Sequence, residues 1–192
     1  VFRSRRDAEI TLDIYRRVPV LVKEGDPKGN PWDVSFMQGL FNMTSDSHLF
    51  HTREALEAEG WILEGNIFVK GDKKMLPLYE AKMLHHYDHR WATYTESGDT
   101  RALTLEEKQD PHTVVMPRYW VPQVDVEGAK DERQWEHDWF IGFRKICRST
   151  DERTAIGFIF PKGGLGDSGN IAFPLSSNSA SFYANVSSLV LD

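Results

Sequence analysis

The 192-residue chain is long enough for one domain with a sizeable core, and its 40% hydrophobic and 27% charged residues are ordinary for a globular protein. The net charge is −6, and no apolar run reaches the roughly 18 residues that span a bilayer. The amino-terminal residues do not match a signal peptide, and the single cysteine, Cys147, excludes an intrachain disulfide framework. We therefore expect a cytoplasmic protein without a membrane partner.

The negative charge is concentrated in residues 96–138, which hold eleven acidic and five basic residues. The rest of the chain is balanced, and residues 139–163 carry a net charge of +3. Within the acidic stretch, the polar residues 96–117 predict an irregular, exposed loop. Acidity confined to one segment weakens the case for nucleic-acid binding without excluding it.

Near the amino terminus, apolar residues at helical spacing predict an amphipathic helix over residues 7–18, opened by Asp7 and ended by Pro19. Gly, Pro and Asp residues then indicate a loop over residues 23–33.

A second helix is expected over residues 52–59, with Thr52 as its N-cap and Gly60 terminating it. Residues 61–63 and 67–69 flank a Gly-Asn pair, which predicts a β-hairpin.

Farther along the chain, residues 75–88 predict one long strand after a turn. Residues 139–148 and 153–160 are apolar on both faces and predict paired central strands. Arg144 and Arg148 would share a face of the first strand by the period of two.

A closing helix is possible over residues 178–191. Together these elements predict a single domain over residues 1–192 of the α+β (mixed α/β) class, with a largely antiparallel central sheet and flanking helices.

The segment over residues 164–169 matches the dinucleotide-binding pattern G-x-G-x-x-G. That chemistry requires a helix to begin at the pattern, so that its N-terminus can hold the pyrophosphate. Here residues 170–173 resemble a strand and Pro174 follows, so we interpret the segment as a loop and assign no cofactor to this chain. The segment Asn30-Pro31-Trp32 matches only part of an Asn-Pro-Pro-aromatic tetrapeptide, because it has one proline where that motif has two. We interpret it as a structural turn.

Histidines cluster at His85, His86 and His89, with Asp88 between them. Imidazoles and a carboxylate could ligate zinc or iron. Adjacent histidines on a strand point to opposite faces, however, so structural or DNA-facing roles are the main interpretation. A metal-dependent hydrolase is the alternative.

Several segments occur in the order found in one protein family. The most specific is Leu-Pro-Leu-Tyr-Glu-Ala-Lys-Met, running into His-His-Tyr-Asp-His-Arg, and the segments together cover residues 2–9, 15–21, 45–50, 76–83, 85–90, 118–122, 142–144, 150–154 and 159–161. The chain resembles the region after the catalytic core of large Type II (IIG-like) restriction–modification enzymes that methylate adenine at N6, which overlaps a TaqI-type specificity domain. Ala81 stands where the family more often has glycine, and the chain stops at Asp192, where such proteins usually continue.

The resemblance implies a fragment of a larger protein, truncated within its specificity region. It would recognise double-stranded DNA and position it for an upstream methyltransferase domain of the same polypeptide, sometimes joined to a nuclease. S-adenosylmethionine would be bound by that parent protein. We assign no catalytic residue here, because the Asn-Pro-Pro-aromatic tetrapeptide is absent. An interaction module that clamps the catalytic domain, with little DNA affinity, is a second hypothesis.

A protein that recognises a DNA sequence needs phosphate contacts that position it on the duplex, and side chains at the base edges that distinguish one sequence from another. The planar guanidinium of arginine suits both kinds of contact. Arg144 and Arg153 flank the turn of the central hairpin and are the first candidates for DNA contact. The other candidates are Arg148, Lys82, Arg90 and Arg118. A solvated surface charge or an internal ion pair is the alternative for each of them.

Overall fold

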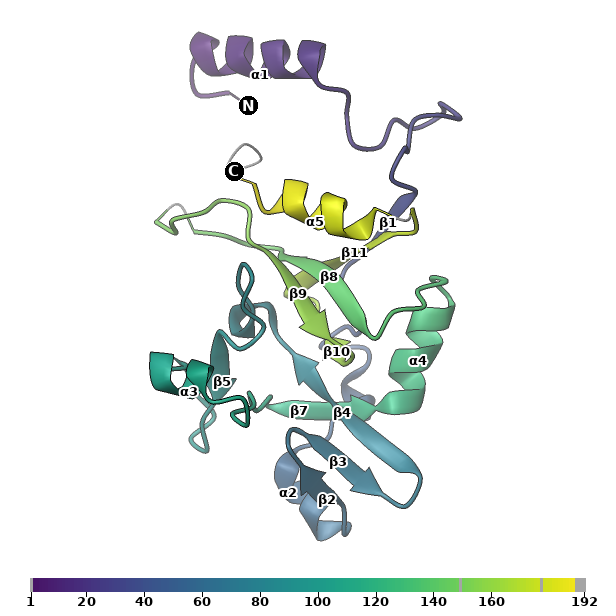
Figure 1. Cartoon of the computed structure of the whole chain (residues 1–192), viewed down its shortest axis with the longest axis vertical. Coiled ribbons are helices and arrows are strands. Elements are labelled where there is room, and N and C mark those ends of the chain that lie inside the picture. Colours follow the sequence, from purple (N-terminus) through teal and green to yellow (C-terminus); the bar gives the residue numbers. More distant parts are fainter. Residues whose placement is uncertain (1, 149, 177, 189–192) are drawn as a thin grey trace.

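The fold is built on two β-sheets (Figure 1). The computed structural model describes residues 2–148, 150–176 and 178–188. In the first sheet every neighbouring pair is antiparallel, in the order β1-β11-β8-β9. Its strands are β1 (Val34–Met37), β8 (Trp139–Arg144), β9 (Gly157–Pro161) and β11 (Gly169–Pro174).

The second sheet has the order β10-β4-β3-β2, with β7 also paired to β4. All of these pairs are antiparallel except β10 with β4. A separate hairpin pairs β5 with β6. The strands are β2 (Ile62–Glu64), β3 (Ile67–Lys70), β4 (Lys73–Tyr79), β5 (Ala92–Tyr94), β6 (Thr100–Ala102), β7 (Tyr119–Pro122) and β10 (Gly164–Leu165).

One main core joins the two sheets, because fully buried side chains from both belong to the same apolar cluster. Phe140, Phe158 and Phe160 come from the first sheet, and Leu78 and Tyr79 come from β4. The chain is therefore an α+β protein in which antiparallel strands support the core and helices cover it.

The helices lie at the periphery of the sheets, and α4 covers part of the second sheet beside β4 and β7. They are α1 (Arg5–Arg17), α2 (Arg53–Ala58), α3 (Leu105–Gln109), α4 (Gln123–Asp131) and α5 (Ser179–Val186), with 3₁₀ turns η1 (Ser47–Leu49) and η2 (Ala81–Met83). The closing helix expected over residues 178–191 is thus present as α5, and residues 189–191 lie outside the described residues.

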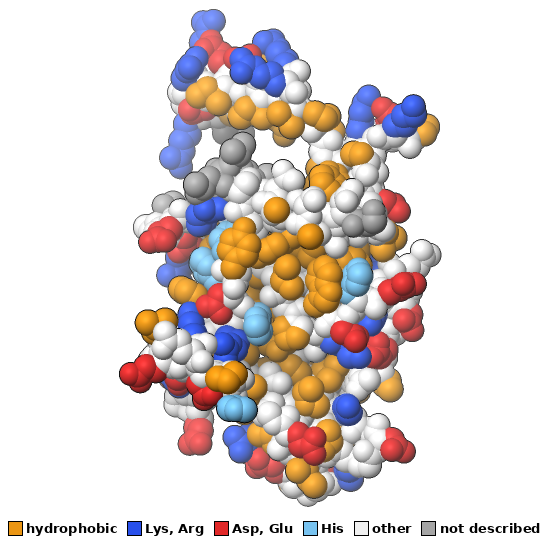
Figure 2. All heavy atoms as spheres, viewed as in Figure 1, with side chains coloured by type: hydrophobic (Ala, Val, Ile, Leu, Met, Phe, Trp, Pro, Cys, Tyr) orange, Lys and Arg blue, Asp and Glu red, His pale blue; other side chains and the backbone are white. Residues whose placement is uncertain are grey.

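Helix α1 stands apart from the sheets and buries none of its residues. Ser4 is its N-cap, and Asp7 reciprocates in a capping box, so the helix starts earlier than its apolar spacing predicted. Figure 2 shows apolar side chains along the edge of α1 that faces the rest of the molecule and charged ones on the opposite edge. Ile10, Leu12 and Tyr15 all remain exposed.

Several elements were predicted correctly from sequence signals within or beside them. Thr52 caps α2, and Gly60 follows it with φ +81°, a left-handed conformation that glycine adopts without strain. The hairpin of β2 and β3 turns at the Gly-Asn pair, and β8 pairs with β9, as predicted.

The long strand predicted over residues 75–88 is wrong. Strand β4 ends at Tyr79, and the chain then turns through η2. Met83 and Leu84 are both fully buried in the same core cluster, whereas on a strand these neighbours would point to opposite faces. Arg148 does not share a strand face with Arg144 either, because β8 ends at Arg144.

Residues 96–117 are mostly exposed, as expected, but they are not irregular throughout. They contain β6 and α3, and α3 starts with a capping box between Thr104 and Glu107. The Thr-x-x-Glu spacing is the sequence signature of that motif, and it was overlooked within an acidic segment.

Candidate nucleic-acid interface

A tight turn at His85–Asp88 presents the first part of the candidate site. His85 and Asp88 exchange two backbone hydrogen bonds of 2.9 and 3.0 Å, which close a two-residue turn over His86 and Tyr87. Tyr87 has φ +56°, in the left-handed region. For a bulky residue this conformation costs about 1–3 kcal/mol, so the surrounding contacts must hold it.

Helix α5 packs against this turn through Tyr183. The backbone N–H of Tyr87 donates to the hydroxyl oxygen of Tyr183 at 3.2 Å, and the two rings meet edge to face with centroids 5.6 Å apart. Tyr183 is buried, whereas Tyr87 is 75% exposed. The turn therefore holds an aromatic ring at the surface.

The two histidines that precede Tyr87 are held by contacts with other parts of the protein. The ring of His85 packs on Trp91 with centroids 4.4 Å apart. His86 places Nε2 2.9 Å from the carbonyl oxygen of Ala155; since a carbonyl only accepts, Nε2 is the donor. Burial lowers the pKa of His85, with a further contribution from the charge of Arg144, and burial likewise lowers the pKa of His89. Both are therefore neutral at pH 7.

The loop between β8 and β9, described over residues 145–148 and 150–156, lies against this turn and forms the second part of the site. Arg144 donates from Nη2 and Nε to the carbonyl oxygen of Leu84, at 2.8 and 3.3 Å. At the other end of the loop, Arg153 donates from Nη2 to the carbonyl oxygen of Ser187 at 3.0 Å. Both first-choice arginines are thus half-buried, and they fix the loop to the body of the protein. Burial lowers the pKa of Arg144 from its usual value.

Between these anchors the loop presents exposed side chains: Lys145, Ile146 and Arg148. The backbone N–H of Arg148 donates to the carboxylate of Asp151 at 2.8 Å. Ile146 is 78% exposed.

Arg90, a candidate for DNA contact, is held by contacts with the backbone. Its guanidinium donates to the backbone carbonyl oxygens of Lys108, Asp110 and Thr113. These contacts hold the end of α3 and the segment after it onto the histidine turn, so the charge is engaged within the protein. Lys108 also contacts this region, with Nζ 2.7 Å from the carboxylate of Asp88.

Lys82 and Arg118 lie outside these two segments. Lys82 is exposed on η2, where Nζ lies 3.4 Å from the carboxylate of Glu80 and 4.7 Å from the centroid of the Tyr94 ring. Lys82 thus forms an internal ion pair, the alternative to DNA contact that the sequence left open for it. Arg118 is exposed, and its guanidinium lies over Tyr119.

Residues 84–91 and 144–156, which we call the turn–loop surface, therefore bring together four of the six predicted contact residues: Arg90, Arg144, Arg148 and Arg153. Counted over the sequence, these two segments hold five basic and three acidic residues, while the whole chain carries −6. The turn–loop surface is a locally basic area on an acidic protein, and its main exposed aromatic ring, Tyr87, was overlooked.

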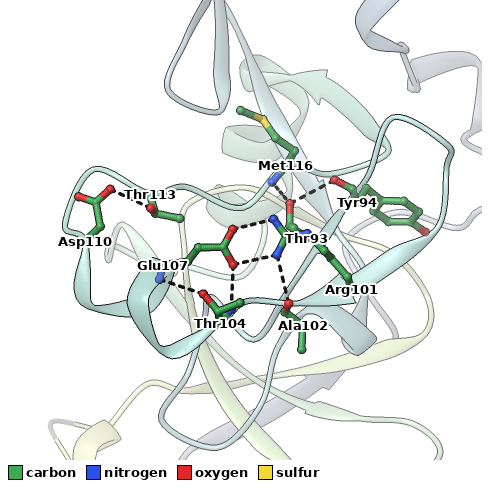
Figure 3. A network of polar contacts seen from close by, with 9 residues as sticks. All are labelled: Thr93, Tyr94, Arg101, Ala102, Thr104, Glu107, Asp110, Thr113 and Met116. Atoms are coloured by element: carbon green, nitrogen blue, oxygen red, sulfur yellow. Dashed lines mark hydrogen bonds and ion pairs between the residues drawn. The ribbon is translucent and has the colours of Figure 1, made fainter.

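A groove of about 870 Å³ lies elsewhere, between α2 and the segments around β5, β6 and α3. Figure 3 shows the polar network on its wall, where the guanidinium of Arg101 makes a bidentate ion pair with Glu107 at 2.8 and 2.6 Å. Arg53 is likewise paired with Glu57 at 2.7 Å. The lining holds four glutamates against three arginines. Two of the three arginines are thus paired with glutamates, and a groove with an excess of carboxylates is unsuited to a polyanion.

The remaining motifs have structural roles. The pattern over residues 164–169 contains β10 and leads directly into β11, so no helix N-terminus is available there for a pyrophosphate. Asn30 accepts from the N–H of Val34 and donates to its carbonyl oxygen, which makes Asn30-Pro31-Trp32 a turn before β1. Within the described ranges, no group of three or more His, Cys, Asp or Glu side chains is arranged to hold a metal ion.

Comparisons of the chain with protein-family models, with curated proteins and with solved structures give no match. The likeness to restriction–modification methyltransferases therefore depends on the sequence segments quoted above. No helix within the described part of the chain has the length and apolar character needed to cross a bilayer.

Proposed function

We propose that this chain is the DNA-binding target-recognition region of an adenine-N6 methyltransferase of the restriction–modification type. In this proposal it acts in the cytoplasm and positions double-stranded DNA for an upstream catalytic domain of the same polypeptide. That domain would bind S-adenosylmethionine, and this chain contributes no catalytic residue. The observation that carries the proposal is the turn–loop surface, which gathers basic and aromatic side chains from two distant segments.

The chemistry of that surface suits a nucleic acid. Lys145 and Arg148 are exposed and can neutralise phosphates, the contacts that give most of the sequence-independent affinity for DNA. Arg144 and Arg153 act as anchors near the two ends of the loop, since each donates to a backbone carbonyl of another segment. A loop anchored in this way loses less conformational entropy on binding than a free one.

The test is fluorescence anisotropy with a random-sequence duplex at low and at moderate salt. The parent chain should bind weakly, with Kd values of about 10⁻⁴–10⁻⁶ M, and should lose affinity steeply as salt rises. Lys145→Ala combined with Arg148→Ala should weaken binding and reduce the slope of log K against log salt by about 2.

The matched control is Lys73→Ala combined with Lys74→Ala, which removes the same charge from an exposed site at the start of β4. This control should bind nearly as well as the parent chain. Equal losses in the two double variants would show that only net charge matters and would remove the turn–loop surface from the proposal.

Helix α1 favours a second candidate function, an interaction module that clamps the methyltransferase domain. Its apolar side chains, among them Ile10, Leu12 and Tyr15, are exposed, and no residue of the helix is buried. An amphipathic helix with an unburied apolar face is typical of a segment that packs on a partner. Absence of DNA binding even at low salt, with the chain folded by circular dichroism, would favour this function over the first.

A further inference from the structure

We propose that Tyr87 is a stacking platform for an unpaired nucleobase. This inference rests on the proposed function and deepens it by naming the chemical class that the centre of the turn–loop surface receives. Tyr87 is the second of the two residues between His85 and Asp88, and its φ is +56°. Turns with a positive φ at that position ordinarily carry glycine or asparagine there.

The ring is held in position even though it is exposed. The N–H of Tyr87 donates to the hydroxyl of Tyr183, and the Tyr183 ring packs against Tyr87 edge to face. His86, on the adjacent side, packs with its centroid 6.2 Å from that of Tyr87 and is itself fixed by the carbonyl oxygen of Ala155. With 75% of the residue exposed, most of the ring is available to a ligand.

The surroundings favour a base within a nucleic acid over an apolar peptide. The turn touches the basic loop through Arg144 and His86, and that loop exposes Lys145 and Arg148 where phosphates can be neutralised. A base presents a π face to the ring whatever its identity, so stacking contributes affinity without requiring a base-edge contact. A base in an intact duplex already stacks on its neighbours, which is why the ligand is an unpaired base.

The experiment uses two duplexes that differ in one position. One is fully paired, and the other carries 2-aminopurine opposite an abasic site, so that the reporter base is unpaired. The parent chain should bind the second duplex more tightly and quench the 2-aminopurine fluorescence. Tyr87→Asn removes the ring but suits the positive φ, so the relief of backbone strain should offset the lost ring contacts and its thermal stability should stay close to that of the parent chain.

Tyr87→Asn should weaken binding to the abasic-site duplex by at least about fivefold, the lower end expected for one stacked base, and should abolish the quenching. Its affinity for the paired duplex should stay within about twofold. Tyr87→Phe keeps the ring and should restore both the affinity and the quenching.

The outcomes separate the two proposals. If Tyr87→Asn binds and quenches like the parent chain, while the Lys145/Arg148 double variant loses binding to both duplexes, the stacking platform is wrong and the DNA-binding function stands. If the folded parent chain binds neither duplex at low salt, the proposed function fails and the stacking platform fails with it.

Discussion

The guanidinium of Arg144 donates to the carbonyl oxygen of Leu84 at 2.8 Å, joining the end of β8 to the start of the histidine turn. These residues are 60 positions apart in the sequence. The contact fixes the two parts of the turn–loop surface relative to each other. Each test of the surface must therefore separate a loss of charge from a loss of shape.

Arg144→Ala should lower the free energy of unfolding by about 1.5–3 kcal/mol. It removes the charged partner of the carbonyl of Leu84, a buried residue, and such a contact is stronger than a neutral hydrogen bond. Urea denaturation measures the change. Arg148→Ala is the matched control, because its side chain is exposed, and it should stay within about 0.5 kcal/mol of the parent chain. Equal stabilities for the two variants would contradict the anchoring role of Arg144.

Arg90→Ala should also destabilise the fold, by about 2 kcal/mol, because three backbone carbonyls lose their donor. Arg90→Lys should not recover the loss, since one ammonium group cannot reproduce the fork of the guanidinium. Thermal unfolding compares the two variants with Arg118→Ala, whose exposed side chain should be nearly neutral. Full recovery by lysine would show that Arg90 acts only through its charge.

Glu107 should titrate far below an ordinary glutamate. Its bidentate pairing with Arg101, together with the N–H of Thr104, lowers its pKa to about 2. A lowered pKa in the folded state means that the contribution to stability is complete above the unfolded value near 4.5 and is lost as pH falls towards 2. Carbon-13 NMR of the side-chain carboxyl should show this value. Arg101→Ala should move it back towards 4.5, and an unchanged value would contradict the ion pair as its cause.

Tyr79 should be the tyrosine most resistant to alkali among those described, because burial raises its pKa to about 12. The folded state prefers the neutral phenol, so its contribution to stability is present below pH 10 and is lost as pH rises through about 12. Absorbance at alkaline pH should show a last ionisation step that Tyr79→Phe removes. Persistence of that step in the variant would assign it to another tyrosine.

DNA should raise the pKa of His85. Burial holds this pKa below its ordinary value of 6.5 in the free protein, so folding loses some stability as pH falls through the lowered value. Phosphates near the turn would favour the imidazolium form, and affinity should therefore increase between pH 7 and pH 5.5. Proton NMR titration of the ring with and without a duplex measures the shift. An identical pKa in both states would place the DNA away from the turn.

The sequence predicted elements whose signals are local. Helix α2 depends on Thr52 and Gly60 at its ends, and the hairpin of β2 and β3 depends on a Gly-Asn turn between apolar runs. The capping box of α3 was equally readable from Thr104 and Glu107, but the acidic composition of its surroundings concealed it.

The candidate site was harder to predict because its contacts are distant in the sequence. Arg90 finds its carbonyl partners 18 to 23 residues away, and Arg153 finds its partner 34 residues away. Basic residues could be identified as candidates, but whether each guanidinium faces solvent or a backbone carbonyl depends on tertiary packing. The exposure of Tyr87 likewise depends on Tyr183, 96 residues later.

The isolation of α1 has a consequence for hydrogen exchange. A helix of 13 residues is close to the shortest length that is stable alone in water, and none of the residues of this one is buried. Its amide protons should therefore exchange through local opening of the helix. Their exchange rates should not follow the dependence on denaturant concentration that the amides in β8 and β11 show. Any molecule that covers its apolar side would slow exchange in α1 alone, so protection there reports binding separately from the stability of the sheets.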